Sequence, residues 1–374
     1  MAGDFIRQLD DSGMGKGQSL AQKVNIDVTL LLLLLALCAC SLFILYSASG
    51  QNTGMVMRQA TYFFLGLIIM FTIAQFHPRW FYMGAPWIYG AVVVALLLVL
   101  LMGVGAKGAQ RWLSVFGFFR FQPSEMMKLA MPMMMAWYLS SRILPPKFKY
   151  IAISLMIVGL PVVLIIRQPD LGTSLLVGAS GLLVLLFAGL RWRWVAGAAI
   201  VVLAAMPVMW YGVMHDYQKQ RVLTFLDPES DPLGAGWNII QSKTAIGSGG
   251  LEGKGWLQGT QSQLEFLPER HTDFIIAVYA EELGLLGVLL LLGLYLLIVL
   301  RGIYMASRSR DTFSRLFAGA LIVTFFIYVF VNIGMVSGLL PVVGVPLPLM
   351  SYGGTSIVTL MAAFGVIMSV YMHR

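Results

Sequence analysis

The stretch Pro268–Leu300, PERHTDFIIAVYAEELGLLGVLLLLGLYLLIVL, joins the two kinds of sequence that decide the fold. Its polar beginning ends at Asp273, and an apolar run follows that is long enough to cross a hydrocarbon core of about 30 Å as a helix. Upstream, the island His215–Asp273 carries 13 of the 42 Asp, Glu, Lys and Arg residues of the chain. A lipid-embedded fold does not require such a segment. We therefore predict a large hydrophilic loop that takes part in chemistry on a substrate held at the membrane surface.

Composition places the whole chain in the membrane class. Of its 374 residues, 59% are hydrophobic and 11% are charged, and the mean hydropathy is +0.82. A soluble domain carries about 25% charged residues. We therefore expect an all-α polytopic membrane protein with about ten transmembrane helices. They are expected at residues 27–48, 58–76, 84–103, 123–140, 150–166, 172–189, 193–213, 275–300, 315–337 and 350–371.

The basic residues predict how these helices cross the membrane. With a cytoplasmic N-terminus, the short inner segments hold fourteen Lys and Arg residues and the short outer loops hold five. The positive-inside rule then predicts both termini in the cytoplasm and the loop 214–274, between helices seven and eight, outside. This distribution explains the net charge of +8, so nucleic acid is not expected as a partner. We expect a single membrane domain over residues 25–374, after a disordered cytoplasmic segment at 1–24.

Asp273 is the first candidate for chemistry. It stands where the outer loop meets the helix at 275–300, close to water yet beside Phe274 and Ile275. Partial desolvation at such a place suits a carboxylate for work as a general base. Asp is also favoured as an N-cap, because it accepts hydrogen bonds from the first N–H groups of a helix. Position alone leaves both roles open.

Lys128 is the second candidate, about two turns into the helix at 123–140. An ionisable residue at membrane depth is costly and marks a functional site or a pair. Glu125 lies three residues earlier on the same face and could neutralise it. The predicted topology puts both near the outer surface, on the side of Asp273. This coincidence favours a shared, outward-facing polar pocket.

Other polar residues at outer helix ends are weaker candidates. Arg58, Arg120 and Arg167 could bind an anionic diphosphate group, although arginines that extend to water at the interface are an equal explanation. Glu281 and Glu282 lie two turns after Asp273, where a role in helix packing is expected. The four histidines show no metal-ligand spacing, so no structural zinc site is predicted.

Helix breakers crowd the stretch Asn332–Ser356, NIGMVSGLLPVVGVPLPLMSYGGTS. Irregular backbone between membrane helices is tolerated where it is buried in protein or lines a cavity. Together with Gln168–Ser174 (QPDLGTS) and Leu267–Phe274 (LPERHTDF), this pattern resembles the SEDS family (shape, elongation, division and sporulation) of bacterial cell-wall proteins. The similarity covers nearly the whole chain from about Asp27. The run Gly259–His271 (GTQSQLEFLPERH) looks like the RodA branch rather than the division-specific FtsW branch.

The resemblance implies a ten-helix membrane enzyme that polymerises lipid II into glycan strands. The aspartate after His-Thr, which is essential in the family, corresponds to Asp273. The lysine early in the fourth helix corresponds to Lys128. The remaining candidates for catalytic support or substrate binding are Glu125, Arg58, Arg120 and His271.

The resemblance also implies a mechanism with one carboxylate. The donor sugar would carry a polyprenyl diphosphate, which leaves without a catalytic acid, so one general base acting on the acceptor hydroxyl suffices. Cationic side chains or a divalent cation, Mg or Mn, would stabilise the departing diphosphate. No organic cofactor is expected. Displacement in one step would invert the anomeric centre and give a β-1,4 link.

The implied partners are lipid II, the polyprenyl-diphosphate-linked glycan, a class B penicillin-binding protein that crosslinks the strands, and other elongation-complex proteins. We expect the protein in the bacterial plasma (inner) membrane, with the large loop periplasmic or extracellular. The apolar runs Leu283–Leu300 and Phe317–Val331 are the expected contact with the penicillin-binding protein, although lipid contact explains them equally well. Two alternatives remain: a lipid II flippase, for which no inverted repeat is visible, and a non-catalytic scaffold of the wall-synthesis complex.

Overall fold

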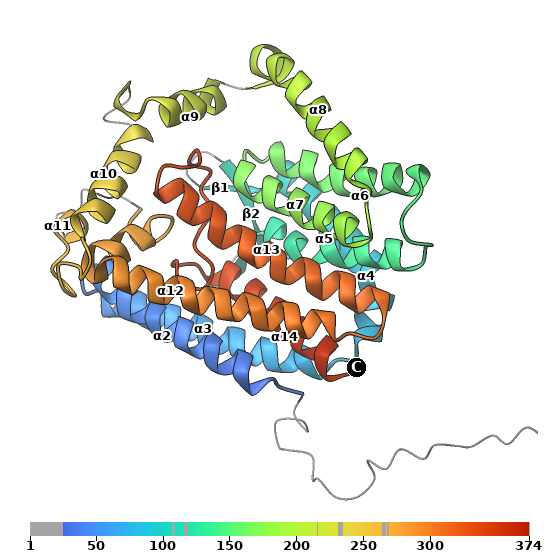
Figure 1. The fold of residues 1–374 in the computed structure, drawn as a ribbon, viewed down its shortest axis with the longest axis horizontal. Helices are drawn as coiled ribbons and strands as arrows, with labels where there is room; N and C mark the ends of the chain where they lie inside the picture. The colour runs from blue at the N-terminus through green and yellow to red at the C-terminus, as the bar shows by residue number, and fades with distance from the viewer. Residues whose placement is uncertain are drawn as a thin grey trace, which may run out of the picture.

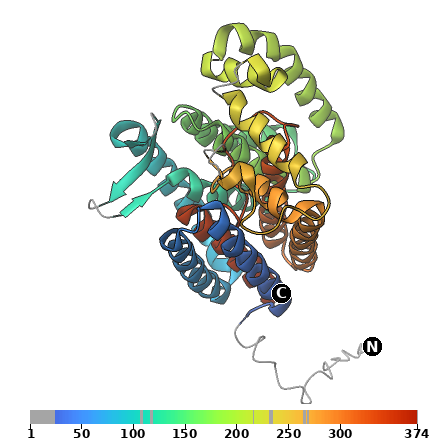
Figure 2. The same ribbon diagram turned by 90° about the vertical axis from the view of Figure 1, so that its left-hand side faces the viewer.

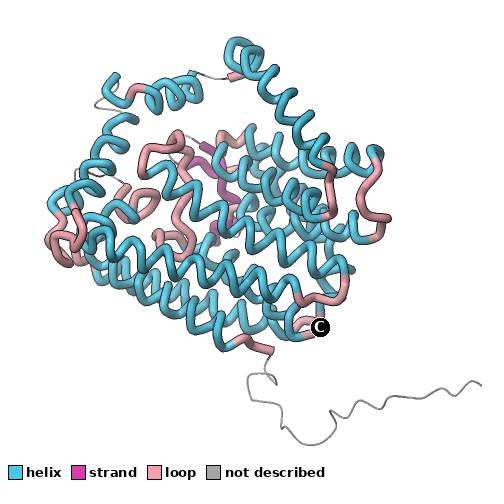
Figure 3. The backbone as a smooth tube through the Cα atoms, viewed as in Figure 1, coloured by secondary structure: helices cyan, strands magenta, loops and turns pink. Residues whose placement is uncertain are grey.

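The computed structural model describes residues 25–106, 109–115, 119–214, 216–230, 235–263, 267 and 269–373. The predicted N-terminal segment 1–24 lies outside these residues. Within them the chain is nearly all helical, and its long helices run side by side in one bundle (Figures 1 and 3).

Each of the ten predicted ranges overlaps a helix. These helices are α2 (Val28–Ala48), α3 (Thr53–Gln75), α4 (Pro78–Met102), α5 (Pro123–Ser140), α6 (Phe148–Ile166), α7 (Leu171–Phe187), α8 (Trp192–Val208), α12 (Ile275–Ser307), α13 (Thr312–Val336) and α14 (Gly354–Met372). In the described part of the chain, seven are long and apolar enough to cross a membrane, namely α2, α3, α4, α6, α12, α13 and α14. The helix α7 is apolar but shorter.

Two helices begin earlier than their apolar runs. The helix α3 starts at Thr53 rather than at 58, because the side chain of Asn52 accepts a hydrogen bond from the backbone N–H of Met55. The helix α4 starts at Pro78 rather than at 84, since proline suits a first helical turn and His77 caps it. Capping residues, and not hydropathy, set these boundaries.

The prediction of an all-α chain was wrong between α4 and α5. Three short strands, β1 (Val104–Ala106), β2 (Ala109–Val115) and β3 (Phe119–Phe121), pair antiparallel in the order β1-β2-β3. They project from the helices as a small sheet (Figure 2). Strands are favoured here because β-branched and aromatic residues fit a pleated surface.

The predicted hydrophilic loop contains helices of its own. After α8 come a π-helical turn η2 (Met209–Val213), α9 (Asp216–Leu226), a 3-10 turn η3 (Pro228–Ser230), α10 (Ala235–Ser248) and α11 (Thr260–Gln263). The stretch Trp237–Ile246, in which apolar and polar residues alternate with helical spacing, lies within α10. One of its faces is buried, and Ser242 Oγ donates to the carbonyl of Val336 at 2.9 Å, so α10 packs against the end of α13. Helices α8, α9 and α10 arch away from the bundle before the chain returns to α12 (Figure 1).

Long-range contacts collect the helix ends into two groups. At one end, Arg301 pairs with Asp27, the N-cap of α2, with Nη2–Oδ2 2.5 Å. The ring of His77 lies 5.0 Å from that of His373 at the same end. At the other end, Gln122 donates to Asp170 at 3.0 Å. If successive helices cross the membrane in opposite directions, successive connections lie at opposite ends of the bundle. The two groups of contacts agree with that pattern.

Candidate active site

Asp273 does not cap α12. The N-cap of this helix is Phe274, and no side chain makes a capping hydrogen bond there. The alternative prediction, that Asp273 is the N-cap of this helix, is therefore wrong. Its side chain is half-buried, in the turn that joins the hydrophilic loop to α12.

The backbone around Asp273 is held by the segment rich in helix breakers. The amide nitrogen of Asn332 donates to the carbonyl of Asp273 at 2.9 Å. Ser351 Oγ donates to the carbonyl of Thr272 at 2.6 Å, and the N–H of Tyr352 donates to the carbonyl of His271 at 2.9 Å. Three successive carbonyls are thus satisfied by one segment, which we call the cradle (residues 332–353). The prediction was irregular backbone that is buried in protein or lines a cavity, and these contacts support burial in protein for the part that they reach.

The cradle also approaches the carboxylate itself. Gly344 has φ +74°, a conformation that favours glycine, and a Cβ there would lie 3.5 Å from Asp273 Oδ2. The same amide nitrogen of Asn332 donates to the carbonyl of Val345 at 2.7 Å. Asn332 therefore links the backbone of Asp273 to the part of the cradle that lies beside the Asp273 carboxylate.

Gln59 holds the far side of the cradle. It is fully buried on α3, donates to the carbonyl of Ser351 at 3.1 Å and accepts from the N–H of Gly353 at 3.4 Å. The neighbouring Arg58, which the sequence singled out, is exposed and donates to the carbonyl of Gly54 within its own helix at 3.3 Å. The buried glutamine, not the arginine, belongs to the framework of the site.

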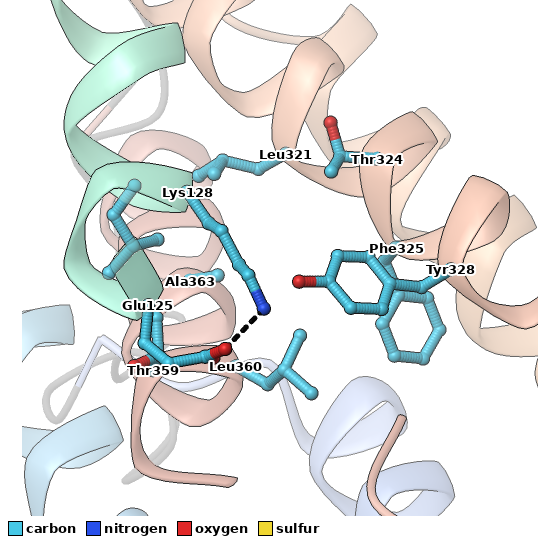
Figure 4. A pocket seen from close by; sticks show the side chains of 10 residues that line it. Glu125, Lys128, Leu321, Thr324, Phe325, Tyr328, Thr359, Leu360 and Ala363 are labelled. Atoms are coloured by element: carbon cyan, nitrogen blue, oxygen red, sulfur yellow. Dashed lines mark hydrogen bonds and ion pairs between the residues drawn. The ribbon is translucent and has the colours of Figure 1, made fainter. Parts of the chain in front are cut away.

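Lys128 and Glu125 form a buried ion pair. Their Nζ and Oε1 atoms are 2.5 Å apart, and both residues are 8% exposed. The ammonium also lies 4.7 Å from the ring centroid of Tyr328 on α13, whose hydroxyl points toward it (Figure 4). A cavity of about 30 Å³, enough for a water molecule, adjoins the pair and is lined also by Thr324 and Thr359. The predicted pairing of Glu125 with Lys128 is confirmed.

One face of α13 connects the ion pair to Asp273. Tyr328, which lies over Lys128, and Asn332, which holds Asp273, are four residues apart and so lie on the same face. At the same end of the bundle, Asp170 ties the start of α7 to the start of α5, because it caps α7 at Thr173 and accepts from Gln122, just before α5. Lys128 and Asp273 thus belong to one framework at one end of the bundle.

The remaining candidates are placed differently. His271 is half-buried next to Asp273, with its ring centroid 6.4 Å from that of Tyr352. Arg167 is exposed at the C-cap of α6. Arg120 lies on β3 opposite Ser114, not at a helix end, and its side chain is outside the described part of the structure.

The match to a known family decides the identity of the chain. A family model described as "Cell cycle protein", which groups FtsW, RodA and SpoVE, matches residues 24–374. The chain belongs to this family, the SEDS family.

Relatives of this SEDS protein share most of its length. Peptidoglycan glycosyltransferase MrdB of Escherichia coli strain K12 is 55% identical over 334 residues, which are 89% of this chain and 90% of that protein. A protein named probable peptidoglycan glycosyltransferase FtsW, from Geobacter metallireducens, is 39% identical, with 84% of each chain covered.

Solved structures share the fold of this SEDS protein. A chain from a study titled "Structural coordination of polymerization and crosslinking by a peptidoglycan synthase complex" matches with a TM-score of 0.82 and 33% identity, over 92% of this chain and 97% of that one. The rod shape determining protein RodA of Thermus thermophilus matches with a TM-score of 0.69 and 30% identity, over 92% and 96%.

Glu281 and Glu282 of this SEDS protein anchor the hydrophilic loop. Both are fully buried. Glu281 Oε1 accepts from Lys254 Nζ at 2.8 Å and from the N–H of Gln261 at 2.9 Å, and Ser47 Oγ donates to Glu282. Backbone N–H groups of Leu257 and Gly259 also bond Glu282. Both carboxylates therefore do more than pack helices: they hold the segment 249–261, which we call the strap.

The strap also binds α12 through its backbone. At Gly284 the helix is interrupted by a non-helical residue, φ +64°. The N–H groups of Lys254 and Gly255 donate to the carbonyls of Glu281 and Glu282, each at 3.0 Å. These bonds satisfy carbonyls that the interrupted helix leaves without intrahelical partners.

Metal ligands are sparse in this site. The described residues contain no group of three or more His, Cys, Asp or Glu side chains that could hold a metal ion. A protein-only metal cage is therefore not found in this part of the chain. A divalent cation bound by a substrate diphosphate stays a prediction.

Proposed function

We propose that this SEDS protein is a peptidoglycan glycosyltransferase that polymerises lipid II into β-1,4 glycan strands during cell elongation, with Asp273 as the general base. The 55% identity to peptidoglycan glycosyltransferase MrdB supports the activity. One geometric observation supports the role of Asp273: three donors of the cradle hold the carbonyls of His271, Thr272 and Asp273, and the cradle passes the Asp273 carboxylate at Gly344.

The reaction needs one base and charge stabilisation. Asp273 takes the proton of the acceptor hydroxyl as this oxygen attacks the anomeric carbon of the donor sugar, whose bond to the polyprenyl diphosphate breaks. The electron pair of the broken bond leaves with the diphosphate, so no protonated acid is required. A single displacement of this kind inverts the anomeric centre.

Lys128 is proposed to act on charge rather than on protons. Its ammonium is fixed by Glu125 and Tyr328 at the end of the bundle that holds Asp273. A fixed cation there favours negative charge on the substrate without reorganisation during the reaction. His271, Arg58 and Arg120 remain proposed contacts of the lipid-linked substrate, together with a divalent cation on its diphosphate.

The proposed topology has ten spans in one membrane domain, residues 25–374. Helices α5, α7 and α8 are the three spans proposed in addition to the seven longer apolar helices. Both termini are cytoplasmic and the loop 214–274 lies outside in this arrangement, with Asp273 at the outer surface of the plasma membrane. The grouping of helix ends and the distribution of basic residues support it.

The proposed partner is a class B penicillin-binding protein that contacts α12 and α13. Leu286 and Leu290 of α12 are 56% and 76% exposed, and Phe326 and Phe330 of α13 are 47% and 60% exposed. The study title of the structural neighbour names a peptidoglycan synthase complex. Crosslinks from these four positions to the transmembrane segment of the partner are expected, and crosslinks only from other helices would refute the contact.

Polymerisation of purified lipid II tests the proposed activity. Wild type, Asp273→Asn and the control Asp216→Asn would be assayed with and without the penicillin-binding protein and divalent cations. Asp216 is an exposed carboxylate in the same loop. We expect full activity in the control and a rate at least about 10² lower in Asp273→Asn, the usual size of a general-base contribution. A parallel flipping assay separates polymerisation from transport.

A further inference from the structure

A cavity of about 320 Å³ opens at the end of the bundle opposite Asp273. It lies where the starts of α4 and α13 meet the end of α14, and Ser369 Oγ donates to the carbonyl of Phe76 beside it at 2.5 Å. The lining residues are His77, Pro78, Arg79, Tyr82, Asp311, Phe313 and His373. None of them belongs to the candidate active site.

One side of this cavity offers positive charge and N–H donors. Within the described residues, no hydrogen bond or ion pair holds the Arg79 guanidinium. His77 uses Nδ1 to accept from the N–H of Arg79 at 3.2 Å, and His373 Nδ1 lies 2.9 Å from the carbonyl of Ser369, to which it donates. His77 therefore keeps its Nε2–H as a donor for a ligand, whereas the free Nε2 of the neutral His373 ring is an acceptor. The two rings are 5.0 Å apart.

The other side offers a carboxylate and aromatic rings. Asp311 caps α13 by accepting from the N–H of Ser314 with Oδ2 at 2.9 Å, and no hydrogen bond from the described residues reaches its Oδ1. The rings of Tyr82 and Phe313 meet edge to face with centroids 5.3 Å apart. A carboxylate beside aromatic rings favours an organic cation. The cavity is thus polarised between an anion side and a cation side.

The depth of the cavity matches the headgroup layer of a membrane. Phe76 and Trp80, at the junction of α3 and α4, are 48% and 66% exposed. Aromatic side chains at the ends of membrane helices mark the level of the lipid headgroups. Basic pockets between helix ends at this level are suited to lipid phosphates.

From this polarity and depth we infer that the cavity binds the headgroup of a phospholipid that carries both a phosphate and a primary ammonium, as phosphoethanolamine lipids do. The phosphate contacts Arg79 and the Nε2–H of His77, and the ammonium contacts Asp311 beside the Phe313 and Tyr82 rings. A phosphoglycerol headgroup satisfies only the first side, because its hydroxyls bring no positive charge to Asp311.

Native mass spectrometry of the full-length protein tests this inference independently of enzymatic activity. The protein would be released from lipid nanodiscs that contain equal amounts of phosphoethanolamine and phosphoglycerol lipids, and the retained lipid would be identified. We expect wild type to retain the phosphoethanolamine lipid over the other by about fivefold or more. Equal retention, preference for phosphoglycerol lipid, or no retained lipid would overturn the inference.

Two variants separate the sides of the cavity. Arg79→Gln is expected to lose retention of both lipids. Asp311→Asn keeps a capping side chain and is expected to lose only the preference, because Arg79 still holds a phosphate. The control Arg193→Gln removes an exposed arginine at the start of α8 and should behave as wild type. If the control loses lipid as Arg79→Gln does, or if both cavity variants retain the wild-type preference, the site is refuted. A general folding defect cannot produce the selective change in Asp311→Asn.

Discussion

Single buried polar side chains determine the geometry around Asp273. Asn332 is fully buried and donates from one amide nitrogen to the carbonyls of Asp273 and Val345. Its Oδ1 has no hydrogen-bond partner among the described residues. The buried side chain therefore leaves one acceptor unsatisfied. A buried polar group in this state costs about 1–3 kcal/mol. We interpret that cost as the consequence of fixing the backbone beside the proposed catalytic carboxylate.

Replacing Asn332 by alanine should lower activity more than stability explains. The loss of both hydrogen bonds leaves two carbonyls without this donor and should lower the free energy of unfolding by about 1–3 kcal/mol. The released backbone lets Asp273 move, and misplacement by about 1 Å can cost 10² in rate. Polymerisation rate and thermal unfolding in detergent would be measured on the same preparation.

Ser242→Ala is the matched control for this prediction. Ser242 is also fully buried and donates to the carbonyls of Ile239 and Val336, the latter near the end of α13, but neither acceptor lies in the turn 271–273 that holds Asp273. A similar loss of stability with wild-type activity is expected. Equal losses of activity in the two variants would show that Asn332 acts only through stability.

The Lys128–Glu125 pair should behave as a coupled unit in stability but not in activity. Lys128→Met leaves a buried carboxylate without its cation and should destabilise the protein by about 3–5 kcal/mol. The double variant Lys128→Met/Glu125→Gln removes both charges and should recover much of that loss. Polymerisation should stay low in both variants if the ammonium acts on the substrate. Recovered activity in the double variant would contradict that role.

The charged residues of the candidate site could be predicted from the sequence, and the neutral ones could not. Asp273, Lys128 and Glu125 could be found because a charge at membrane depth is conspicuous. Gln59, Asn332 and Ser351 are ordinary polar residues, and their acceptors lie far along the chain: Gln59 and Ser351 are 292 residues apart. Only the folded structure brings such pairs together, so no local pattern could predict them.

At the scale of elements, the strap and α12 depend on close backbone approach. Gly284 has φ +64°, and a Cβ there would lie 2.3 Å from the backbone nitrogen of Gly253. A Cβ at Gly253 would lie 2.1 Å from the carbonyl oxygen of Glu282. Side chains at these positions would force the strap off the helix, since backbone atoms cannot yield as side chains do.

Gly284→Ala should therefore release the strap. We expect faster amide hydrogen exchange and faster proteolysis within residues 249–261, because the backbone bonds to α12 would be lost. The control Gly293→Ala lies in the same helix and has open space around its Cβ position. Unchanged protection of the strap in Gly284→Ala, or equal loss of protection in Gly293→Ala, would contradict this account.

Elements were predictable from sequence to different degrees. The apolar runs located each of the long helices in the described part of the chain. A run of that length identifies a membrane helix even where its ends are placed a few residues away. The small sheet between α4 and α5 was missed, because strands as short as β1 and β3, with three residues each, carry no clear period. The interruption of α12 at Gly284 was missed as well, since its cause is contact with the strap rather than a proline.

At the level of the whole molecule, the proposed function places Asp273 and the strap on the outer side of the membrane. The headgroup cavity lined by His77 and Arg79 would then face the inner leaflet. Both assignments follow from one distribution of basic residues, so a test of the topology tests them together.

Single cysteines can establish the topology. In a background with Cys38→Ala and Cys40→Ala, Glu252→Cys should react with a membrane-impermeant maleimide on intact spheroplasts. Arg310→Cys should react only after permeabilisation. Both native residues are exposed, one in the strap and one between α12 and α13. The opposite pattern would invert the proposed orientation.

The most direct test measures binding and turnover of lipid II in one preparation of Asp273→Asn. A general base acts on the acceptor hydroxyl during the reaction, so its removal should leave the affinity for lipid II within about twofold and reduce polymerisation at least about 10². Wild-type turnover by this variant, with lipid II bound as in the wild type, would contradict the central claim that Asp273 takes the proton.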